Sequence, residues 1–592
     1  MFTTSARRSV LCLALLTACS SEPPADLILH NGEIYTMTAE QPWASAVVIN
    51  GNQIVAVLAD DSEIEAYRGE GTRVVDLGGK LTVPGFVDAH THFAGFGAQQ
   101  NDIYLMGVTD DAGLREEVAR VVEFLPDGEW ITGGRWEAFK TWEADWRERE
   151  ALKDGRWQPT REVIDPVSPA HPCFVNSYDR ELYLANTLAL EAAGLVDAPV
   201  EGMKLDADGR PTGLIYRGSP AIARIQAERV GKTEERILNE LRAGLQVMAQ
   251  RGITEIHDMS STRQMERYAK LQESGELTAR VWGRPHLLDA QRYADEGIQM
   301  NAHPVTGERD RYLRVGAFKG HYDGLMGSHG ALLFEPYVDR PDTHGTYRQC
   351  TSDARGFRTK SPEKFFELGK IAMEAGFSIN THAIGTRGIS ELLDDYERLV
   401  EASGQPLDRF RVIHGETVIP TDFDRFAAMD VIAEVNPNSM EDDMRWVIDR
   451  LGPEREKLVF PLRSYIDKGV RLTIGSDIPG AAGAEFSNHP ALAIHAAVHR
   501  TKPDGTPAGG WIPEQKITVH EALEAFTVNG AYAVYDDDVR GTIAPGMLAD
   551  FAVCSVNIVK ETDRILDMEI DMTIVDGRIV FDRATDEVRK AR

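Results

Sequence analysis

The sequence has few cysteines, a shortage of positive charge and no apolar run of membrane-spanning length. Only 5 of its 592 residues are cysteine, and Cys12 and Cys19 lie at the extreme N-terminus, which excludes a disulfide framework. Lys and Arg number 64 against 93 Asp and Glu, giving a formal charge of −29. So acidic a chain repels a phosphate backbone, and we expect no nucleic-acid partner. The hydrophobic share of 42% and charged share of 27% are typical of a globular enzyme.

The N-terminus has the pattern of an export signal. Arg7 and Arg8 precede an apolar run over 10–18, which is too short to span a bilayer because about twenty residues are needed. The run ends in Leu16-Thr17-Ala18-Cys19, which resembles the bacterial lipobox. This resemblance implies cleavage before Cys19 and lipid attachment to that residue, and the following Ser20 favours the outer membrane. An ordinary cleaved signal peptide is the alternative.

These features predict the location of the protein and its first two segments. We expect a lipoprotein signal peptide at 1–18 and a tether at 19–25. The mature chain would be held on the membrane through lipidated Cys19, in the bacterial cell envelope, on the outer membrane and facing the periplasm.

Both ends of the mature chain contain short apolar runs separated by turn residues. Residues 26–84 and 541–592 have this texture. Asn31-Gly32, Asn50-Gly51 and Asp576-Gly577 are dipeptides that favour two-residue hairpins. We therefore expect one small β-sandwich-like domain that is built from both ends of the chain.

The middle of the chain, 85–540, alternates strands with helices, which is typical of βαβ units and a parallel sheet. Thr233 is a candidate cap for a helix to Arg251, and a second helix begins at Pro362 and ends before Gly376. Eight segments read as parallel strands and predict an α/β fold of the (β/α)8 TIM-barrel type. They are GFVDAHTH, GITEIHD, ARVWGRPH, RVGAFKG, FSINTHA, RFRVIHG, VIAEVNP and VRLTIGSD.

A long insertion separates the first two of these strands, over about 100–230. It holds Trp130, Trp136, Trp142, Trp146 and Trp157, five of the nine tryptophans in the chain. Two interpretations are open: the tryptophans form the insertion's own core, or they belong to a lid over a substrate pocket.

The ends of the predicted strands carry residues that bind metals. His90 and His92 are two apart on one strand, so their side chains point to the same face. Because strand ends converge on one face of a (β/α)8 barrel, we expect them to meet ligand candidates from the other strands. Imidazole and carboxylate suit zinc and related divalent metals. The other strand-end candidates are Lys319, His382, His414 and Asp477.

The motifs that contain these residues resemble the amidohydrolase superfamily, and within it amidohydrolase family 3, which includes N-substituted formamide deformylase-like enzymes. The resemblance covers about Asp26 to Asp582 and rests on the order and spacing of its motifs. They are PGFVDAHTHF, FKGHYDGLMGSHGA, THAIGTRGI, RVIHGE, VNP, IGSD and GTIAPGMLADFAV.

The resemblance implies a binuclear metal site. His90, His92 and Asp477 would bind one metal, and His382 and His414 would bind a second. Lys319 would be carboxylated by carbon dioxide, and the resulting carbamate would bridge both metals. A salt bridge from Lys319 to Asp323 is the structural alternative. Zinc is expected from the ligand types, with one or two ions per chain.

These groups predict a hydrolase that attacks a nonpeptide C–N bond of a small molecule, such as an N-substituted amide, formamide or cyclic amide, with a metal-activated hydroxide. Asp477 is the candidate proton shuttle. Two alternatives stay open: a hydrolase of the same fold that acts on an ester or small dipeptide, and a noncatalytic lipoprotein that binds a ligand. The sequence leaves the substrate and the oligomeric state open.

Other histidines lie near the predicted strand ends. His257 and His321 are candidates to orient a ligand, and His329 is a candidate to bind substrate, although each could equally be structural. His489, His495 and His499 follow Asp477, and the last two share a helical face, which we interpret as helix packing or surface.

Overall fold

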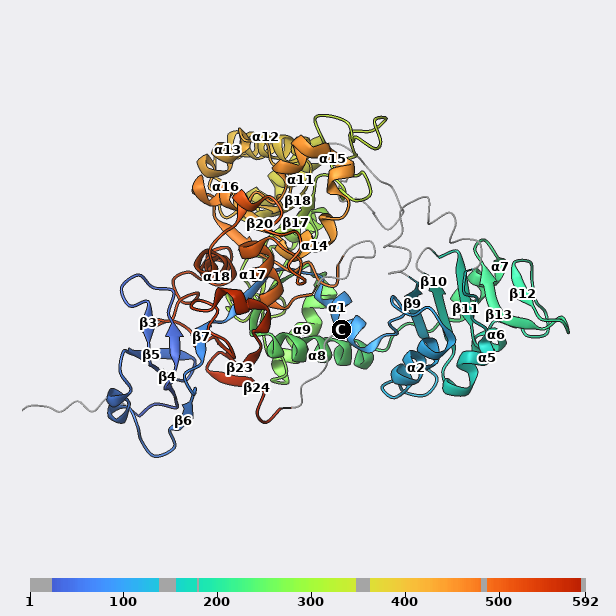
Figure 1. The fold of residues 1–592 in the computed structure, drawn as a ribbon, viewed down its shortest axis with the longest axis horizontal. Helices are drawn as coiled ribbons and strands as arrows, with labels where there is room; N and C mark the ends of the chain where they lie inside the picture. The colour runs from blue at the N-terminus through green and yellow to red at the C-terminus, as the bar shows by residue number, and fades with distance from the viewer. Residues whose placement is uncertain (1–23, 138–155, 178–179, 348–361, 481–486, 587–592) are drawn as a thin grey trace, which may run out of the picture.

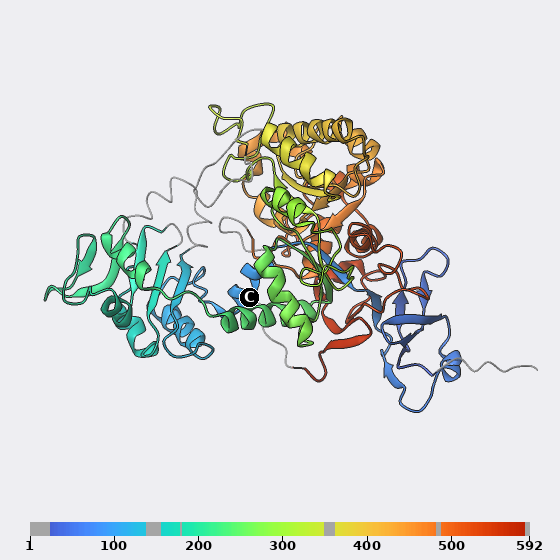
Figure 2. The same cartoon turned by 180° about the vertical axis from the view of Figure 1, so that it is seen from behind.

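The computed structural model describes residues 24–137, 156–177, 180–347, 362–480 and 487–586. It has the mixed α/β content that the sequence predicts. Central helices and strands are flanked by the N-terminal strands at one end and by the sheet of the insertion at the other, as two opposite views agree (Figures 1 and 2). The predicted signal peptide, Cys19 and all but the last two tether residues lie outside the described residues. Among the helices that are described, none is both long and apolar enough to cross a membrane.

The central strands are parallel and form two hydrogen-bonded sheets. The first has the order β16-β15-β14-β8 and the second the order β17-β18-β19-β20-β21. Among the described residues, no ladder of paired strands joins these two sheets into one continuous barrel. The strands are β8 (Phe86–Thr91), β14 (Ile253–Asp258), β15 (Arg280–Gly283), β16 (Leu313–Val315), β17 (Phe318–His321), β18 (Ile379–Ala383), β19 (Arg411–His414), β20 (Ile432–Val435) and β21 (Leu472–Ile474).

The two parallel sheets meet at both edges through isolated bridges. Thr91 bridges to Ile478, and the Asp477 amide donates to the His90 carbonyl oxygen at 2.8 Å. His286 bridges to Lys319 at the other junction. The prediction of a single strand at RVGAFKG is wrong, because this segment is divided between β16 and β17. The division lies at Gly316, where a Cβ atom would come within 2.4 Å of the Trp282 ring.

Helices cover the parallel strands, with the largest apolar core between them. The predicted helix after Thr233 is confirmed as α8 (Glu234–Gln250): the Thr233 side chain accepts a hydrogen bond from the Arg236 amide at 3.2 Å. The second predicted helix is confirmed as α11 (Pro362–Glu374). The others along this region are α1 (Phe93–Asn101), α9 (Thr262–Glu273), α10 (Ala290–Glu296), α12 (Thr386–Ser403), α13 (Asp422–Ala428), α14 (Met440–Asp443), α15 (Val447–Arg455), α16 (Leu462–Asp467), α17 (Pro490–His499), α18 (Val519–Phe526) and α19 (Val528–Tyr532).

Strands from both ends of the chain form two further sheets, which pack against one apolar cluster. The orders are β5-β4-β1-β6 and β24-β23-β22-β7-β2-β3. The strands are β1 (Leu27–His30), β2 (Glu33–Tyr35), β3 (Trp43–Ala44), β4 (Ala46–Asn50), β5 (Gln53–Leu58), β6 (Arg73–Asp76), β7 (Leu81–Pro84), β22 (Phe551–Cys554), β23 (Ile570–Val575) and β24 (Arg578–Asp582).

Two of the three predicted hairpins are present. Asn50 pairs with Gln53 around Gly51, and Val575 pairs with Arg578 around Gly577. The prediction for Asn31-Gly32 is wrong, because β1 and β2 belong to different sheets. The turn at Asn31-Gly32 instead carries the chain from one sheet to the other. Within this turn the Asn31 amide donates a hydrogen bond to the Asp61 carboxylate at 2.8 Å.

The insertion after β8 contains its own five-stranded sheet, in the order β12-β13-β11-β10-β9. Trp136 is fully buried and Trp130 is nearly so, each in an apolar cluster of this region. For these two tryptophans the core interpretation is confirmed, while Trp142 and Trp146 lie outside the described residues. The elements are β9 (Ile131–Trp136), β10 (Cys173–Ser177), β11 (Leu182–Ala185), β12 (Met203–Leu205), β13 (Pro211–Tyr216), α2 (Asp111–Val122), α5 (Arg161–Ile164), α6 (Thr187–Ala192) and α7 (Pro220–Glu228).

Candidate metal centre

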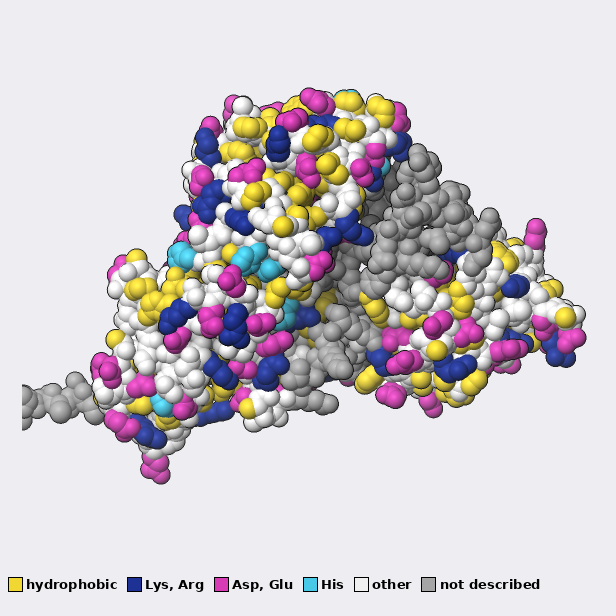
Figure 3. Space-filling view, in the orientation of Figure 1, with side chains coloured by type: hydrophobic (Ala, Val, Ile, Leu, Met, Phe, Trp, Pro, Cys, Tyr) yellow, Lys and Arg dark blue, Asp and Glu magenta, His cyan; other side chains and the backbone are white. Residues whose placement is uncertain are grey.

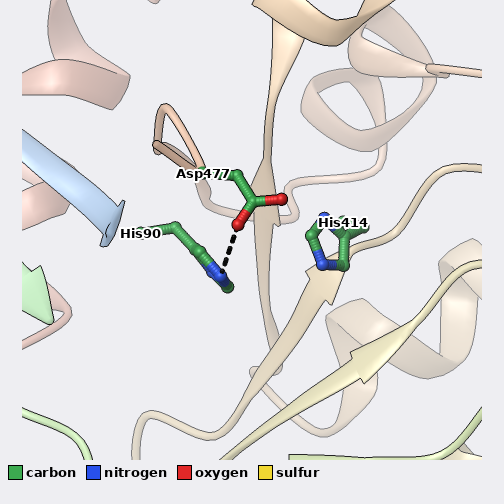
Figure 4. A group of neighbouring side chains, drawn as sticks. All are labelled: His90, His414 and Asp477. Carbon is green, nitrogen blue, oxygen red and sulfur yellow. Dashed lines mark ion pairs between the residues drawn. The ribbon is translucent and has the colours of Figure 1, made fainter. Parts of the chain in front are cut away.

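The structure brings the predicted ligand residues to one edge of the parallel strands. His90 lies near the end of β8, His414 ends β19, and Asp477 follows β21. These three offer ligand atoms that all lie within 4.8 Å of one another. His90 Nε2 is 3.3 Å from Asp477 Oδ1, and Figure 4 shows both imidazoles turned toward the carboxylate. Side chains from separate strands thus form one compact donor cluster.

The remaining predicted ligands surround this cluster. His92 Nε2 is 3.4 Å from Asp477 Oδ1, and its side chain is 47% exposed. The His382 ring lies 4.5 Å from the His414 ring between centroids, at the other side of the site. Lys319 is buried on β17, close enough to His90 and His414 for its charge to help lower the pKa of both imidazoles. All six predicted residues therefore gather in one region.

Two of the three cluster residues adopt strained backbone conformations. The φ angles are 72° at His414 and 57° at Asp477, in the left-handed region that non-glycine residues seldom occupy. Such a residue costs on the order of 1–3 kcal/mol and persists only where its surroundings hold it. Both strained residues, His414 and Asp477, are thus residues whose side chains lie beside His90.

Close backbone approach between β21 and β8 also determines the position of His90. A Cβ atom on Gly475 would lie 2.4 Å from His90 Cβ and 2.5 Å from its amide nitrogen. Gly475→Ala should therefore lower the free energy of unfolding by about 1–3 kcal/mol, the range for overpacking a filled interior. Urea unfolding of the full chain measures this change. Gly231→Ala is the control, because nothing lies within 4 Å of a Cβ there; equal stability of both variants would contradict the steric argument.

The charge state of the cluster suits a divalent cation. Burial is the main cause that lowers the pKa of His414, to about 3, and it also lowers that of His90. Both imidazoles are therefore neutral at neutral pH and keep a lone pair for a metal. Burial alone would raise the pKa of Asp477, but the His90 and His92 imidazoles hold it well below its usual range. Two neutral imidazoles beside one carboxylate form a donor set suited to zinc.

An unsatisfied buried atom also indicates a missing partner. His90 Nε2 is buried and makes no well-directed hydrogen bond to the described residues. Its other nitrogen, Nδ1, lies 2.6 Å from Glu434 Oε1. Because buried polar atoms are almost always paired, the unsatisfied Nε2 fits a ligand position facing Asp477 and His414. The residues present thus fit a divalent metal.

The predicted accessory histidines have different positions. His321 lies beside the candidate ligands, with its ring 5.5 Å from that of His382. His257 is buried among the strands, where it contacts Arg411 at 3.0 Å and none of the candidate ligands directly. His329 lies 3.0 Å from Asp339, and its ring contacts the Tyr337 ring.

The later histidines lie on the helices beyond the site. His495 and His499 have ring centroids 4.9 Å apart on α17, and Figure 3 shows histidine side chains over α17 and α18 among mixed acidic and basic groups. His489 caps the start of α17 through the Ala491 amide. These contacts agree with the helix-packing interpretation.

Asp323 has a structural role on the far side of His382. Its carboxylate accepts hydrogen bonds from the amides of Leu332, Ile384 and Gly385 at 2.8–3.0 Å. Its Oδ1 also lies 3.7 Å from His382 Nε2. The carboxylate thereby ties the loop after β17 to the end of β18, where His382 lies.

Sequence reasoning missed three residues beside the candidate ligands. Glu434 and Asn436 come from β20 and the turn after it, and each contacts Nδ1 of a cluster histidine. His286 stacks on His321 with ring centroids 5.9 Å apart. The signal was present, because all three are polar residues at or near the ends of predicted strands.

A sequence model of the amidohydrolase family, that of family 3, matches residues 73–581. The chain belongs to the amidohydrolase family. This confirms the resemblance seen in the strand-end motifs, and the match runs from β6 to β24. Membership of this family supports a hydrolase that acts with the help of a metal.

Proteins that are similar to this chain match it over almost its whole length. Protein LONG AFTER FAR-RED 3 of Arabidopsis thaliana is 29% identical over 95% of this chain and 94% of its own length. N-substituted formamide deformylase of Arthrobacter pascens is 25% identical over 94% of this chain and 98% of its own. A metal-dependent hydrolase from Pyrococcus horikoshii, whose crystal structure is known, has a TM-score of 0.67 at 22% identity, over 90% of this chain and 98% of its own. The last similarity establishes a shared fold.

Proposed function

We propose that this amidohydrolase-family chain is a metal-dependent hydrolase of a nonpeptide C–N bond in a small molecule, such as an N-substituted amide, formamide or cyclic amide. The observation that carries the proposal is the buried cluster of His90, His414 and Asp477, in which His90 Nε2 faces the other two groups. A relative named as an N-substituted formamide deformylase supports the substrate class.

Two groups of residues would hold metal. His90, His92 and Asp477 lie together on one side, and His382 and His414 lie together on the other. Lys319 is buried and close enough to His90 and His414, one from each group, to affect the pKa of both, so a carbamate formed from its amine and carbon dioxide would supply anionic oxygens there. Divalent zinc supplies Lewis-acid polarisation of the substrate carbonyl and acidification of water when bound.

The chain's own residues would manage the proton. Asp477 is ionised in its surroundings, so one carboxylate oxygen can accept the proton of the attacking water. The same group then delivers that proton to the nitrogen that leaves. His90 Nε2 and His92 Nε2 lie 3.3 and 3.4 Å from Asp477 Oδ1, so all three groups could hold the same metal ion.

We propose that the two parallel sheets are parts of one (β/α)8 barrel that is interrupted at two junctions. The isolated bridges Thr91 to Ile478 and His286 to Lys319 support this reading. The domain division that accompanies it is a barrel over 85–540 with the insertion at about 100–230, and a composite β-domain from 26–84 and 541–592. Shared sheets between β7 and β22 support the composite domain.

We propose that the mature chain is anchored through lipidated Cys19 to the bacterial outer membrane and faces the periplasm. The support is the motif Leu16-Thr17-Ala18-Cys19 after a short apolar run. Its substrate would then be a small molecule that reaches the periplasm.

The test combines metal analysis with a substrate panel. The full chain, prepared with zinc and bicarbonate, should contain about two metals and hydrolyse members of a panel of formamides and cyclic amides. Treatment with EDTA should remove most of this turnover, and added zinc should restore it. Turnover of esters or dipeptides alone would favour the alternative hydrolase, while neither metal nor turnover would favour a ligand-binding lipoprotein.

A further inference from the structure

Glu434 is a buried carboxylate that reaches a candidate ligand from a strand that bears no ligand itself. It lies on β20, which is separated from β8 by β21. Its Oε1 nevertheless lies 2.6 Å from Nδ1 of His90, and both side chains are at most 1% exposed. An ionised carboxylate only accepts hydrogen bonds, so the proton of this contact belongs to Nδ1 of His90.

Two buried arginines hold the Glu434 carboxylate. Arg284 Nη1 lies 2.9 Å from both carboxylate oxygens, and Arg411 Nη1 lies 2.9 Å from Oε2. Both guanidinium groups are themselves anchored: Arg284 donates to the carbonyl oxygens of Ala89 and His257 at 2.7 and 3.0 Å, and Arg411 bonds to His257. Charge and geometry together keep Glu434 anionic and directed at His90.

Asn436 makes the corresponding contact to the second cluster histidine. Its Oδ1 lies 2.7 Å from His414 Nδ1, and its Nδ2 donates to the Gly475 carbonyl oxygen at 2.7 Å. Because only the amide nitrogen can donate to that carbonyl, the amide oxygen must face His414 and accept its Nδ1 proton. Residues 434 and 436 are two apart along the chain, and each orients an imidazole from a different strand.

We propose that Glu434 is the positioning residue of this centre: through its hydrogen bond to His90 Nδ1, it fixes the tautomer that presents an unprotonated Nε2 to a metal. Asn436 does the same for His414 with a neutral acceptor. This inference rests on the proposed function, because it assigns a purpose to the orientation of ligands in that site. A carboxylate partner also increases the basicity of the imidazole that it contacts.

The first test measures zinc affinity. Glu434→Gln keeps the size of the side chain but removes its charge, so its amide can present a donor toward His90. Zinc affinity of the full chain, measured by competition with a chromogenic chelator, should fall by about 10–100-fold, the range for loss of such an orienting partner. Affinity equal to the parent in a folded variant would overturn the proposal.

A matched control separates orientation from the loss of a buried charge. Glu240→Gln removes another buried carboxylate, which is paired with Lys232 and Arg236 and contacts no candidate ligand. Its zinc affinity should stay within about twofold of the parent. If Glu434→Gln fails to fold, Glu434→Asp keeps the arginines paired while shortening the reach to His90, and its zinc affinity should still fall about tenfold. Undiminished affinity in Glu434→Asp would then overturn the proposal.

A measurement on metal-free protein keeps this inference distinct from the proposed function. Histidine labelled with ¹⁵N reports which ring nitrogen carries the proton, and His90→Asn identifies the signal of His90. The parent should show His90 protonated at Nδ1, and Glu434→Gln should lose this preference. If His90 of the parent is protonated at Nε2, the positioning role of Glu434 is overturned. If His90 is protonated at Nδ1 but the protein neither binds metal nor shows turnover, only the proposed function is overturned.

Discussion

Asp477→Asn should lower kcat by about 10²–10⁴-fold, the contribution expected from a positioned proton-transfer group. The amide keeps the size of the carboxylate but cannot accept a proton from water and pass it to the leaving nitrogen. Because Asp477 also contacts His90 and His92 at 3.3–3.4 Å, the variant should bind zinc more weakly as well. Steady-state kinetics at saturating zinc isolates the effect on turnover.

Asp422→Asn is the matched control for this experiment. Asp422 is a buried aspartate at the start of α13 that accepts hydrogen bonds from the Ser390 hydroxyl and from Arg425. It contacts no candidate ligand, so at saturating zinc its kcat should stay within about threefold of the parent. Near-parental turnover in Asp477→Asn would remove the proton-transfer role from this residue.

Lys319→Ala should reduce metal content from about two ions per chain to one or fewer, with most of the turnover lost. The substitution removes the amine that carbon dioxide would convert into an anionic bridge. Elemental analysis of parent and variant, each prepared with and without bicarbonate, measures the change. Bicarbonate should raise the metal content of the parent but not of the variant.

Two comparisons sharpen this result. A short carboxylate such as acetate should partly restore metal content in Lys319→Ala, because it can place two oxygens in the space that the side chain leaves. Lys232→Ala is the control, since Lys232 is an ion-paired lysine that bonds to Asp102 and Glu240 in the region of the insertion. Equal metal content in the parent and Lys319→Ala would rule out the carbamate bridge.

The sequence allowed prediction of the candidate ligands because each lies at the end of a strand that is recognisable from its apolar residues. His90 lies hundreds of residues before His414 and Asp477, but parallel strands bring such ends to one edge. The pattern could not reveal Glu434 in its role, because the contact with His90 crosses β21 and joins strands that are not neighbours. Contacts across the interior depend on strand tilt and side-chain length, which cannot be deduced from the spacing of apolar residues in the sequence.

Local turn signals were reliable only where both flanking strands belong to one sheet. Asn50-Gly51 and Asp576-Gly577 join paired strands, as expected. Asn31-Gly32 has the same turn chemistry, but Asp61 and Asp76 bind its asparagine and the following strand joins another sheet. The dipeptide specifies a tight turn, whereas packing against the rest of the chain decides which strands become partners.

The pairing of β7 with β22 constrains how the chain can mature. Thr82 lies opposite Val553, so a strand made early in synthesis finds this partner only after nearly the entire polypeptide has emerged. Contacts between residues so far apart in sequence form slowly, because a very long loop must close first. Until β22 is available, one edge of β7 stays without its partner strand. An unpaired strand edge is a template for aggregation, so the yield of folded protein should depend on how long this edge stays uncovered.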